Sequence, residues 1–202
     1  VATVHLGYAA DGFHTLLDGE LFIPEDWAAD TARRRRAGIP EDVNYRPKWR
    51  IAVEQIRRAL GNGIRFAWLT FDEGYGGKPP FLREIDVLGQ QYVAEIPKSF
   101  VGWTVEPEVL HREHARDKAM GRPRKLPRLK VRNTPFAEVG EILKHSSILR
   151  RQPWAPYRVK DGEKGPMVWE VKHTLMTVKG EQRLPGMRVH LLVARNVLKP
   201  DE

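Results

Sequence analysis

The sequence contains no cysteine, so disulfide bonds and thiolate metal ligands are both excluded. No apolar run approaches the roughly 20 residues that a membrane-spanning helix needs. The N-terminal residues do not follow the basic-then-apolar order of a signal peptide. With 30% charged residues and a mean hydropathy of −0.50, the chain is expected to be a soluble, cytoplasmic protein that makes no membrane contact.

Internal repeats and long low-complexity tracts are also missing from the 202 residues. A hydrophobic fraction of 41% is enough to bury a core, in one large domain or two small ones. The first half alternates strand-like and helix-like segments, whereas the second half begins rich in Pro, Arg and Lys and then becomes strand-like. The sequence therefore predicts a mixed α/β (α+β) fold, divided into residues 1–98 and a β-rich part at residues 99–202.

The clearest helix is predicted at residues 46–63, where Trp49, Val53, Ile56 and Leu60 form one apolar stripe. Shorter helices are expected at residues 24–40, 81–89 and 134–145, the last with Thr134 as its N-cap. Gly12 is expected to form the turn of an N-terminal hairpin. The predicted strands cover residues 1–9, 13–23, 64–72, 90–97, 167–178 and 187–197.

The apolar run at residues 64–72 ends on Asp72, and three glycines follow within five residues. Functional groups in open α/β sheets gather at the carboxyl ends of strands, and carboxylate oxygens are ligands that Mg²⁺ prefers. An aspartate in this position is also a common turn former or helix cap. The neighbouring Glu73 would point to the opposite face of a strand. Both a structural and a metal-binding role for Asp72 stay open.

Positive charge is concentrated in residues 112–132, which hold nine Lys or Arg and two acids in a chain of net charge +8. A localised basic stretch suggests a polyanion as partner. Its Gly-Arg-Pro core also resembles basic hooks that enter the minor groove of DNA. A solvated loop is the alternative. The expected phosphate contacts are Arg122, Arg124, Lys125, Arg128 and Lys130.

Four consecutive arginines at residues 33–36 form a second candidate surface for DNA. Arg33 and Arg36 would share one side of a helix, because residues three apart are neighbours there. A solvated helix face would explain the same residues.

Three segments occur in the order FHTLLDGELFIPEDW, YRPKWRIAVEQI and LTFDEGYGGKPPFL. Together they resemble bacterial insertion-sequence transposases, which carry an Asp-Asp-Glu (DDE) triad on an RNase H-like fold. That family has a hairpin leading to Leu-Pro-x-x-Trp, then Gly-Ile-Pro, a helix with Lys-x₃-Ala-x₃-Ile, and an Asp before x-Gly-Tyr-Gly. The matching residues here are 21–27, 38–40, 48–56 and 72–76. The later segments GRPRK, GPMVWEVK and LLVARN resemble the β-rich insertion of the family.

The resemblance implies that residues 1–98 belong to a partial RNase H-like mixed sheet with helices, and that residues 99–202 are the insertion with a DNA-contacting loop. Asp72 would be the second acid of the triad and a ligand of Mg²⁺ or Mn²⁺. The complete bacterial enzyme would cut and join double-stranded DNA at the ends of an insertion sequence by phosphoryl transfer, with a homodimer as the expected assembly.

The family places its first Asp before the hairpin and its Glu after the insertion, so Asp72 is expected to be the only triad acid in this chain. The acids Asp11, Asp18 and Glu170 are not assigned to the triad. We therefore expect this chain alone to bind Mg²⁺ weakly or not at all and to be inactive. A non-catalytic DNA-binding remnant of a transposase and a module that binds an acidic protein partner are the open alternatives.

Overall fold

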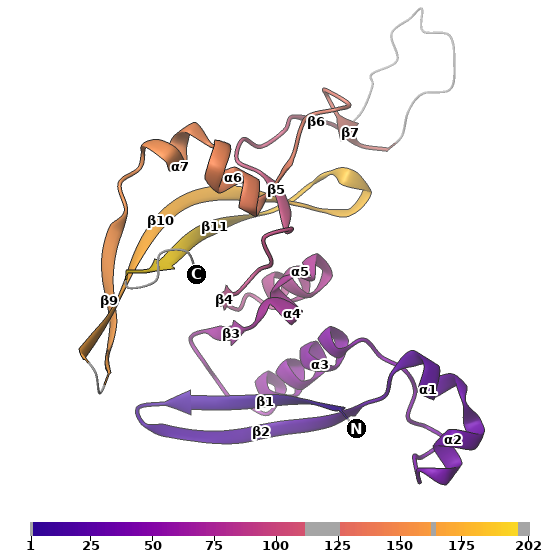
Figure 1. The fold of residues 1–202 in the computed structure, drawn as a ribbon. Helices are drawn as coiled ribbons and strands as arrows, with labels where there is room; N and C mark the ends of the chain where they lie inside the picture. Colours follow the sequence, from indigo (N-terminus) through magenta and orange to yellow (C-terminus); the bar gives the residue numbers. More distant parts are fainter. Residues whose placement is uncertain (1, 112–125, 163–164, 198–202) are drawn as a thin grey trace, which may run out of the picture. The chain divides into compact units, whose positions relative to one another are not determined.

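The computed structural model describes residues 2–111, 126–162 and 165–197. The chain divides into two compact units, Val1–Ile96 (unit 1) and Pro97–Glu202 (unit 2), each with its own helices and strands (Figure 1). The mixed α+β class predicted from the sequence is confirmed. In the part of the chain that the structure describes, no helix is both long and apolar enough to cross a membrane.

Unit 1 begins with an antiparallel hairpin of β1 (Ala2–Ala10) and β2 (Phe13–Phe22). Its turn holds two left-handed residues, Asp11 at φ 48° and Gly12 at φ 83°. Such a pair matches the twist of the flanking strands in tight hairpins, and Asp-Gly adopts it at low cost. The predicted turn at Gly12 is therefore confirmed.

Helix α3 (Lys48–Gly61) packs against this hairpin on one side and against α5 (Pro79–Val87) on another. Of the predicted apolar stripe, Val53 and Ile56 are buried, whereas Trp49 and Leu60 are only half-buried. The buried surface is wider than the stripe because the helix has neighbours on two sides. Gln55 also lies in the core, where its Nε2 donates a hydrogen bond to the Val4 carbonyl at 2.9 Å.

The second sheet of unit 1 pairs β3 (Leu69–Phe71) in parallel with β4 (Tyr92–Ala94). The connection between them contains α4 (Glu73–Gly76) and α5. The prediction of one strand over residues 64–72 is wrong in its extent. Residues 64–68 face no neighbouring strand among the described residues. The Ile64 amide donates to the Ala59 carbonyl at 3.0 Å, at the end of α3, and Trp68 stays 56% exposed.

Unit 2 is built on a long antiparallel hairpin of β10 (Gly165–Lys179) and β11 (Pro185–Asn196), which confirms the two predicted C-terminal strands. The other edge of β10 pairs with β9 (Ala155–Gly162) and with β5 (Val101–Trp103), and β5 also pairs with β8 (Ala137–Glu138). Two further strands, β6 (Val109–Leu110) and β7 (Arg128–Leu129), form a separate short hairpin.

Helices α6 (Val139–His145) and α7 (Ser147–Arg151) precede the β10–β11 hairpin in the chain, and α7 packs against β10. The predicted N-cap role of Thr134 is wrong, because its hydroxyl donates to the Val131 carbonyl at 2.8 Å instead. The helix begins five residues later, since residues 137–138 pair with β5 as a strand. Leu149 is fully buried, with 0% of its surface exposed, and joins α7 to the core of unit 2.

Candidate catalytic carboxylate and basic surfaces

Asp72 is the first residue after β3 and the N-cap of α4, with an extended backbone at φ −76° and ψ 179°. Its Oδ1 accepts a hydrogen bond from the Gly74 amide at 3.0 Å, and its carbonyl oxygen accepts one from the Gly76 amide at 2.8 Å. The side chain is exposed. Within residues 2–111, 126–162 and 165–197, Oδ2 has no hydrogen-bond partner, so one oxygen caps the helix and the other is available to a ligand.

The glycines after Asp72 have a packing role that the sequence did not reveal. A Cβ added to Gly76 would lie 2.0 Å from the carbonyl oxygen of Glu95 and 3.2 Å from Cβ of Ala94. Only glycine permits such a close approach of one backbone to another. Gly76 therefore lets α4 rest against the end of β4, and this contact fixes the position of the residue that caps the helix.

A second carboxylate follows the neighbouring strand at the same edge of the parallel pair. The amide of Glu95 donates to the Phe71 carbonyl at 3.1 Å, so Glu95 and Asp72 continue two strands that are in register. Both side chains are exposed. Glu95 was not predicted as a site residue, although an acid directly after an apolar strand is the same signal that marked Asp72.

Aromatic side chains from β3, β4, α4 and α5 pack together, and Phe71 among them directly precedes Asp72 in the chain. The ring of Phe71 lies 4.9 Å from Phe81 and 5.7 Å from Tyr92, and Tyr75 lies 5.5 Å from Phe81, measured between centroids. Burial raises the pKa of the Tyr75 phenol above its usual value, and the negative charge of Asp72 raises it further. The carboxylate of Asp72 therefore interacts electrostatically with the phenol of Tyr75 in α4.

The donor set at this edge can be compared with what a divalent ion requires. Asp72 fits Mg²⁺ or Mn²⁺ as one ligand, because it presents an exposed carboxylate oxygen that no neighbour occupies. Phosphoryl-transfer sites draw two or three acids from separate elements. In the described part of the chain, no three His, Asp or Glu side chains are grouped so that they could hold a metal ion.

The three acids that were not assigned to the triad lie in a turn or in ion pairs. The carboxylate of Asp18 lies 2.9 Å from the guanidinium of Arg58, which ties β2 to α3. Glu170 pairs with Arg195 at 2.7 Å across β10 and β11. Asp11 occupies the left-handed turn of the first hairpin. One turn and two ion pairs therefore account for the positions of these three acids.

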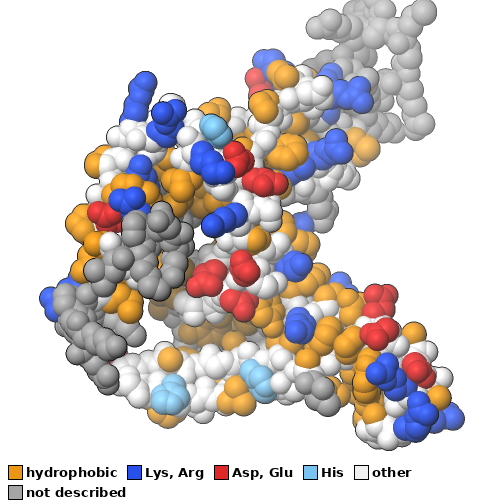
Figure 2. Space-filling view, viewed as in Figure 1, with side chains coloured by type: hydrophobic (Ala, Val, Ile, Leu, Met, Phe, Trp, Pro, Cys, Tyr) orange, Lys and Arg blue, Asp and Glu red, His pale blue; other side chains and the backbone are white. Residues whose placement is uncertain are grey.

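The four arginines lie in a segment where the predicted single helix is divided into α1 (Glu25–Ala29) and α2 (Thr31–Arg36). Asp30 separates them and caps α2, since its Oδ1 accepts from the Arg33 amide at 2.9 Å. Figure 2 shows basic and acidic side chains side by side on the surface of this segment.

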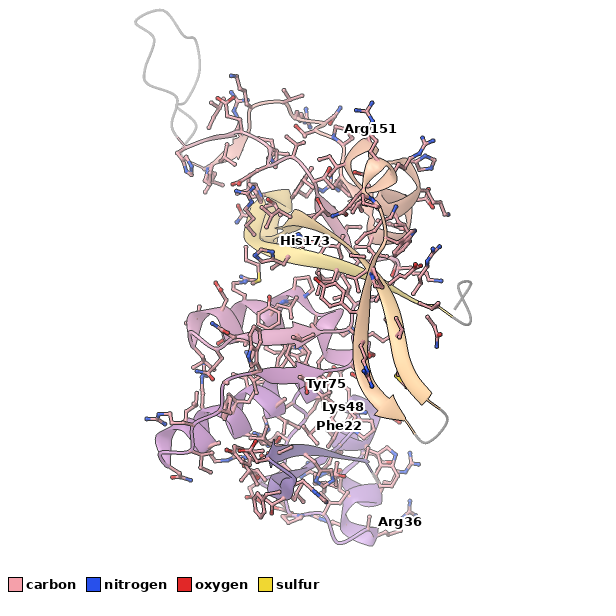
Figure 3. All side chains as sticks on the ribbon, turned by 90° about the vertical axis from the view of Figure 1, so that its left-hand side faces the viewer. Phe22, Arg36, Lys48, Tyr75, Arg151 and His173 are labelled. Carbon is pink, nitrogen blue, oxygen red and sulfur yellow. The ribbon has the colours of Figure 1, made fainter. Side chains whose placement is uncertain are left out.

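The side chains of the four arginines have different environments. The Arg33 guanidinium stacks 4.0 Å from the centroid of the Trp27 ring, and Arg35 lies 3.5 Å from Glu41. Arg34 is buried, and its Nη2 donates to three carbonyls of the following loop at 2.7 to 3.0 Å. Arg36 is exposed at the edge of the unit (Figure 3), without a salt bridge to any described residue. The run therefore presents at most part of its charge to a partner.

The five predicted phosphate contacts of the basic stretch also differ in their surroundings. Arg122, Arg124 and Lys125 lie outside the described residues. Arg128 lies in β7 and is half-buried. The Nζ of Lys130 lies 2.8 Å from Oε2 of Glu108, so an acid neighbours its charge.

Charge is unevenly divided between the two units. Unit 2 contains 22 Lys and Arg against 12 Asp and Glu, whereas unit 1 contains 12 against 14. The positive excess of the chain therefore belongs to unit 2. Exposed arginines of unit 2 outside the basic stretch include Arg150 and Arg151 on α7 and Arg183 before β11.

Comparison with protein families identifies one match that covers most of the chain. A family described as DDE superfamily endonuclease matches residues 1–166, a range that includes Asp72 and the whole basic stretch. Searches of curated proteins and of solved structures give no match to this sequence.

Proposed function

The chain belongs to the DDE superfamily of endonucleases, and on that premise we propose that it is part of a DNA transposase that cuts and joins strands at insertion-sequence ends. Unit 1 contributes part of an RNase H-like catalytic core, and unit 2 is the insertion that holds DNA. The substrate is double-stranded DNA, bound by a homodimer that engages two transposon ends. Membership of a family of endonucleases supports a nucleic-acid substrate. The strand-transfer reaction at insertion-sequence ends is our proposal.

The observation that carries this proposal is the environment of Asp72. The side chain stands at the carboxyl end of a parallel strand, where α/β folds place their functional groups. Its Oδ2 is unoccupied by any described residue, while Oδ1 is held by the Gly74 amide. A carboxylate fixed by one oxygen and open at the other is oriented before a ligand arrives, which is what a catalytic site requires.

Asp72 would hold a divalent ion, Mg²⁺ or Mn²⁺, as one of its oxygen ligands. When bound, such an ion acts as a Lewis acid that stabilises charge on the phosphodiester group. The chain's own contribution is to fix the carboxylate through α4 and Gly76, and to hold the DNA backbone through the positive surface of unit 2. Phosphate contacts of this kind position a duplex but carry little sequence information.

A test compares the unchanged chain with Asp72→Asn and Glu73→Gln. Asparagine still caps a helix as well as aspartate does, so Asp72→Asn removes the charge and keeps the local fold. Glu73→Gln removes an equal charge from an adjacent exposed side chain. Binding of Mn²⁺ is measured by titration with electron paramagnetic resonance, and Mn²⁺-dependent nicking of a supercoiled plasmid is measured in parallel.

The proposal expects Asp72→Asn to weaken Mn²⁺ binding by about tenfold or more and to abolish any nicking, with Glu73→Gln unchanged. Measurable Mn²⁺ binding that is equal in all three chains would contradict the assignment of Asp72. Binding without nicking would support the proposed metal ligand and leave strand cleavage to a larger assembly.

The second candidate function is a non-catalytic DNA-binding remnant of a transposase. The helix-capping hydrogen bond from Gly74 favours it, because that bond gives Asp72 a reason to be present without any chemistry. Salt-dependent binding of duplex DNA, together with Mn²⁺ binding that is the same for the unchanged chain and Asp72→Asn, would identify this function. A chain that binds an acidic protein instead of DNA would show no binding to duplex DNA at low salt.

A further inference from the structure

A groove in unit 2 brings the described end of the basic stretch against a turn that is far away in the sequence. One wall comes from residues 126–133, including β7, and the other from the turn at residues 182–184 between β10 and β11. Its volume is about 770 Å³, which is within the range of pockets that hold small ligands. The described lining residues are Leu126, Pro127, Arg128, Leu129, Arg132, Asn133, Gln182, Arg183 and Leu184.

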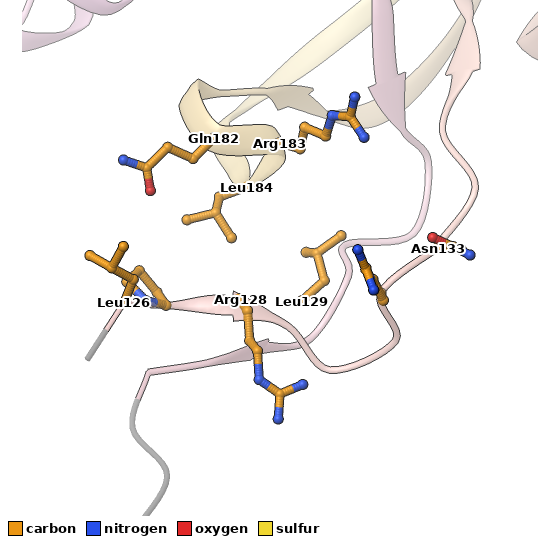
Figure 4. Close-up of a pocket in the computed structure, with 9 residues that line it drawn as sticks. Leu126, Arg128, Leu129, Asn133, Gln182, Arg183 and Leu184 are labelled. Atoms are coloured by element: carbon orange, nitrogen blue, oxygen red, sulfur yellow. The ribbon is translucent and has the colours of Figure 1, made fainter. Parts of the chain in front are cut away.

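The groove has an apolar floor and a cationic border. In Figure 4, Leu129 and Leu184 point into the space between β7 and the turn, while the guanidinium groups of Arg128 and Arg183 extend to its outer sides. Arg132 and Arg183 are both exposed. Among the described side chains that line the groove, none is acidic.

The turn that carries Arg183 has a costly backbone. Gln182 has φ 54° and Arg183 has φ 62°, so two successive residues with side chains occupy the left-handed region. Glycine adopts this conformation without penalty, whereas a residue with a Cβ does not. The turn is closed by a hydrogen bond from the Gly180 amide to the Leu184 carbonyl at 2.8 Å, which holds both residues in place. An outlying backbone that persists in a fixed turn is a reason to look for a functional side chain there.

The chemistry of the groove matches one segment of a nucleic-acid backbone. Guanidinium groups donate paired hydrogen bonds to phosphate oxygens, and leucine side chains offer an apolar surface to a sugar. A DNA strand carries both kinds of group, because each sugar lies between two phosphates. A small inorganic anion or a neutral apolar ligand would match only one of the two kinds of group in the groove.

We propose that a DNA strand crosses this groove, with its deoxyribose on Leu129 and Leu184 and its phosphates bound by Arg132 and Arg183. This inference rests on the proposed function, because it names residues by which unit 2 holds DNA. Arg132 and Arg183 are not among the phosphate contacts predicted from the sequence. Arg132 lies at the end of the basic stretch and Arg183 lies in a turn 51 residues later in the sequence.

The experiment measures the affinity of the full chain for a fluorescent duplex by anisotropy across a salt series. The double variant Arg132→Gln/Arg183→Gln is compared with Arg150→Gln/Arg151→Gln, which loses the same charge from exposed positions on α7 outside the groove. The slope of log K against log salt is negative, and each lost phosphate contact makes it shallower by about 0.9. The groove variant is expected to have a slope that is shallower by about two and to bind DNA at least about tenfold more weakly.

Two results separate the inference from the proposed function. If the unchanged chain binds DNA and the two double variants have equal slopes and affinities, the groove is not a DNA contact, and the proposed function stands. If the unchanged chain does not bind DNA at low salt, the proposed function fails and the inference fails with it. Circular dichroism of each variant shows whether it is folded.

A single change in the turn gives a second, independent readout. Arg183→Gly removes the guanidinium and also relieves the left-handed strain, so it is expected to raise the thermal unfolding midpoint of unit 2 while weakening DNA binding about tenfold. Arg183 acting only as a structural residue would not give these opposite changes. A higher midpoint with unchanged DNA affinity would overturn the role of Arg183.

Discussion

Lys130 and Glu108 form a salt bridge across the short hairpin of unit 2, with Nζ 2.8 Å from Oε2. The pair is exposed, so its contribution to stability is small. Under the proposed function its consequence for binding is larger, because Glu108 would compete with DNA for the Lys130 ammonium, one of the cations expected to contact phosphate.

Removal of this competitor should strengthen DNA binding. Glu108→Gln frees the Lys130 ammonium, and one more phosphate contact should steepen the salt slope by about 0.9. Glu106→Gln is the matched control, since it changes the net charge equally without releasing a described salt bridge. Anisotropy titration across a salt series checks the difference. Equal slopes for the two variants would mean that Lys130 does not reach DNA.

The contact between Gly76 and Glu95 predicts a stability change. Gly76→Ala places a Cβ against a backbone carbonyl that cannot move aside, and the expected cost is about 3 kcal/mol of unfolding free energy. Gly61→Ala is the control, because its added Cβ would meet nothing within 4 Å and lies in a helix. That control should be neutral or more stable by up to about 1 kcal/mol. Urea denaturation followed by circular dichroism measures both variants, and a stable Gly76→Ala chain would contradict the packing of α4.

Arg34 and Arg36 should respond very differently to replacement. Arg34→Ala leaves the carbonyls of Pro40, Glu41 and Val43 without their charged donor and is expected to cost about 3 kcal/mol. Arg36→Ala should stay within about 0.5 kcal/mol, as is usual for an exposed side chain. Urea denaturation gives the two values, and limited trypsin digestion reports whether the loop at residues 37–43 opens. Similar stability of the two variants would show that the buried arginine does not organise this loop.

The raised pKa of Tyr75 predicts a pH dependence. A phenol whose pKa is higher in the folded than in the unfolded state adds stability below its usual pKa, and this is lost as pH rises through the raised value, above about pH 10. Asp72→Asn removes the second cause of the shift, so Tyr75 should ionise at lower pH, although burial still holds its pKa up. Phenolate absorbance, with Tyr75→Phe to assign the signal, measures the change.

Tyr92 provides an internal control for that titration. Its pKa is raised by burial and then by Asp86, so Asp86→Asn should shift Tyr92 and leave Tyr75 in place. A shift of both phenols in either variant would indicate a general loss of structure in place of a local charge effect.

Local patterns in the sequence predict the elements whose causes are local. The Asp-Gly turn and the helix α3 are set by neighbouring residues, and the structure confirms both elements, although only Val53 and Ile56 of the predicted apolar stripe are buried. The extent of β3 depends on which strand lies beside it, and residues 64–68 have no such neighbour among the described residues. Thr134 has the right residue type for a cap, yet the pairing of β8 with β5 moves the start of the helix.

The same limit applies to the site. Asp72 is visible in the sequence because an acid after an apolar run has a recognisable pattern. The run of arginines gives no sign that Arg34 turns inward, because that orientation depends on the loop that follows it. The groove of unit 2 combines residues 126–133 with residues 182–184, and only the fold brings such distant segments together.

The capping role of the Asp72 carboxylate, taken with its proposed role as a metal ligand, has a consequence for how lineages of this family change. A descendant that no longer needs chemistry still needs the start of α4, so selection for folding alone keeps a capping residue at this position. Asparagine satisfies that requirement and aspartate is no longer demanded. Drift from Asp to Asn at position 72, with Gly76 retained, would therefore mark descendants that kept the fold after losing strand cleavage.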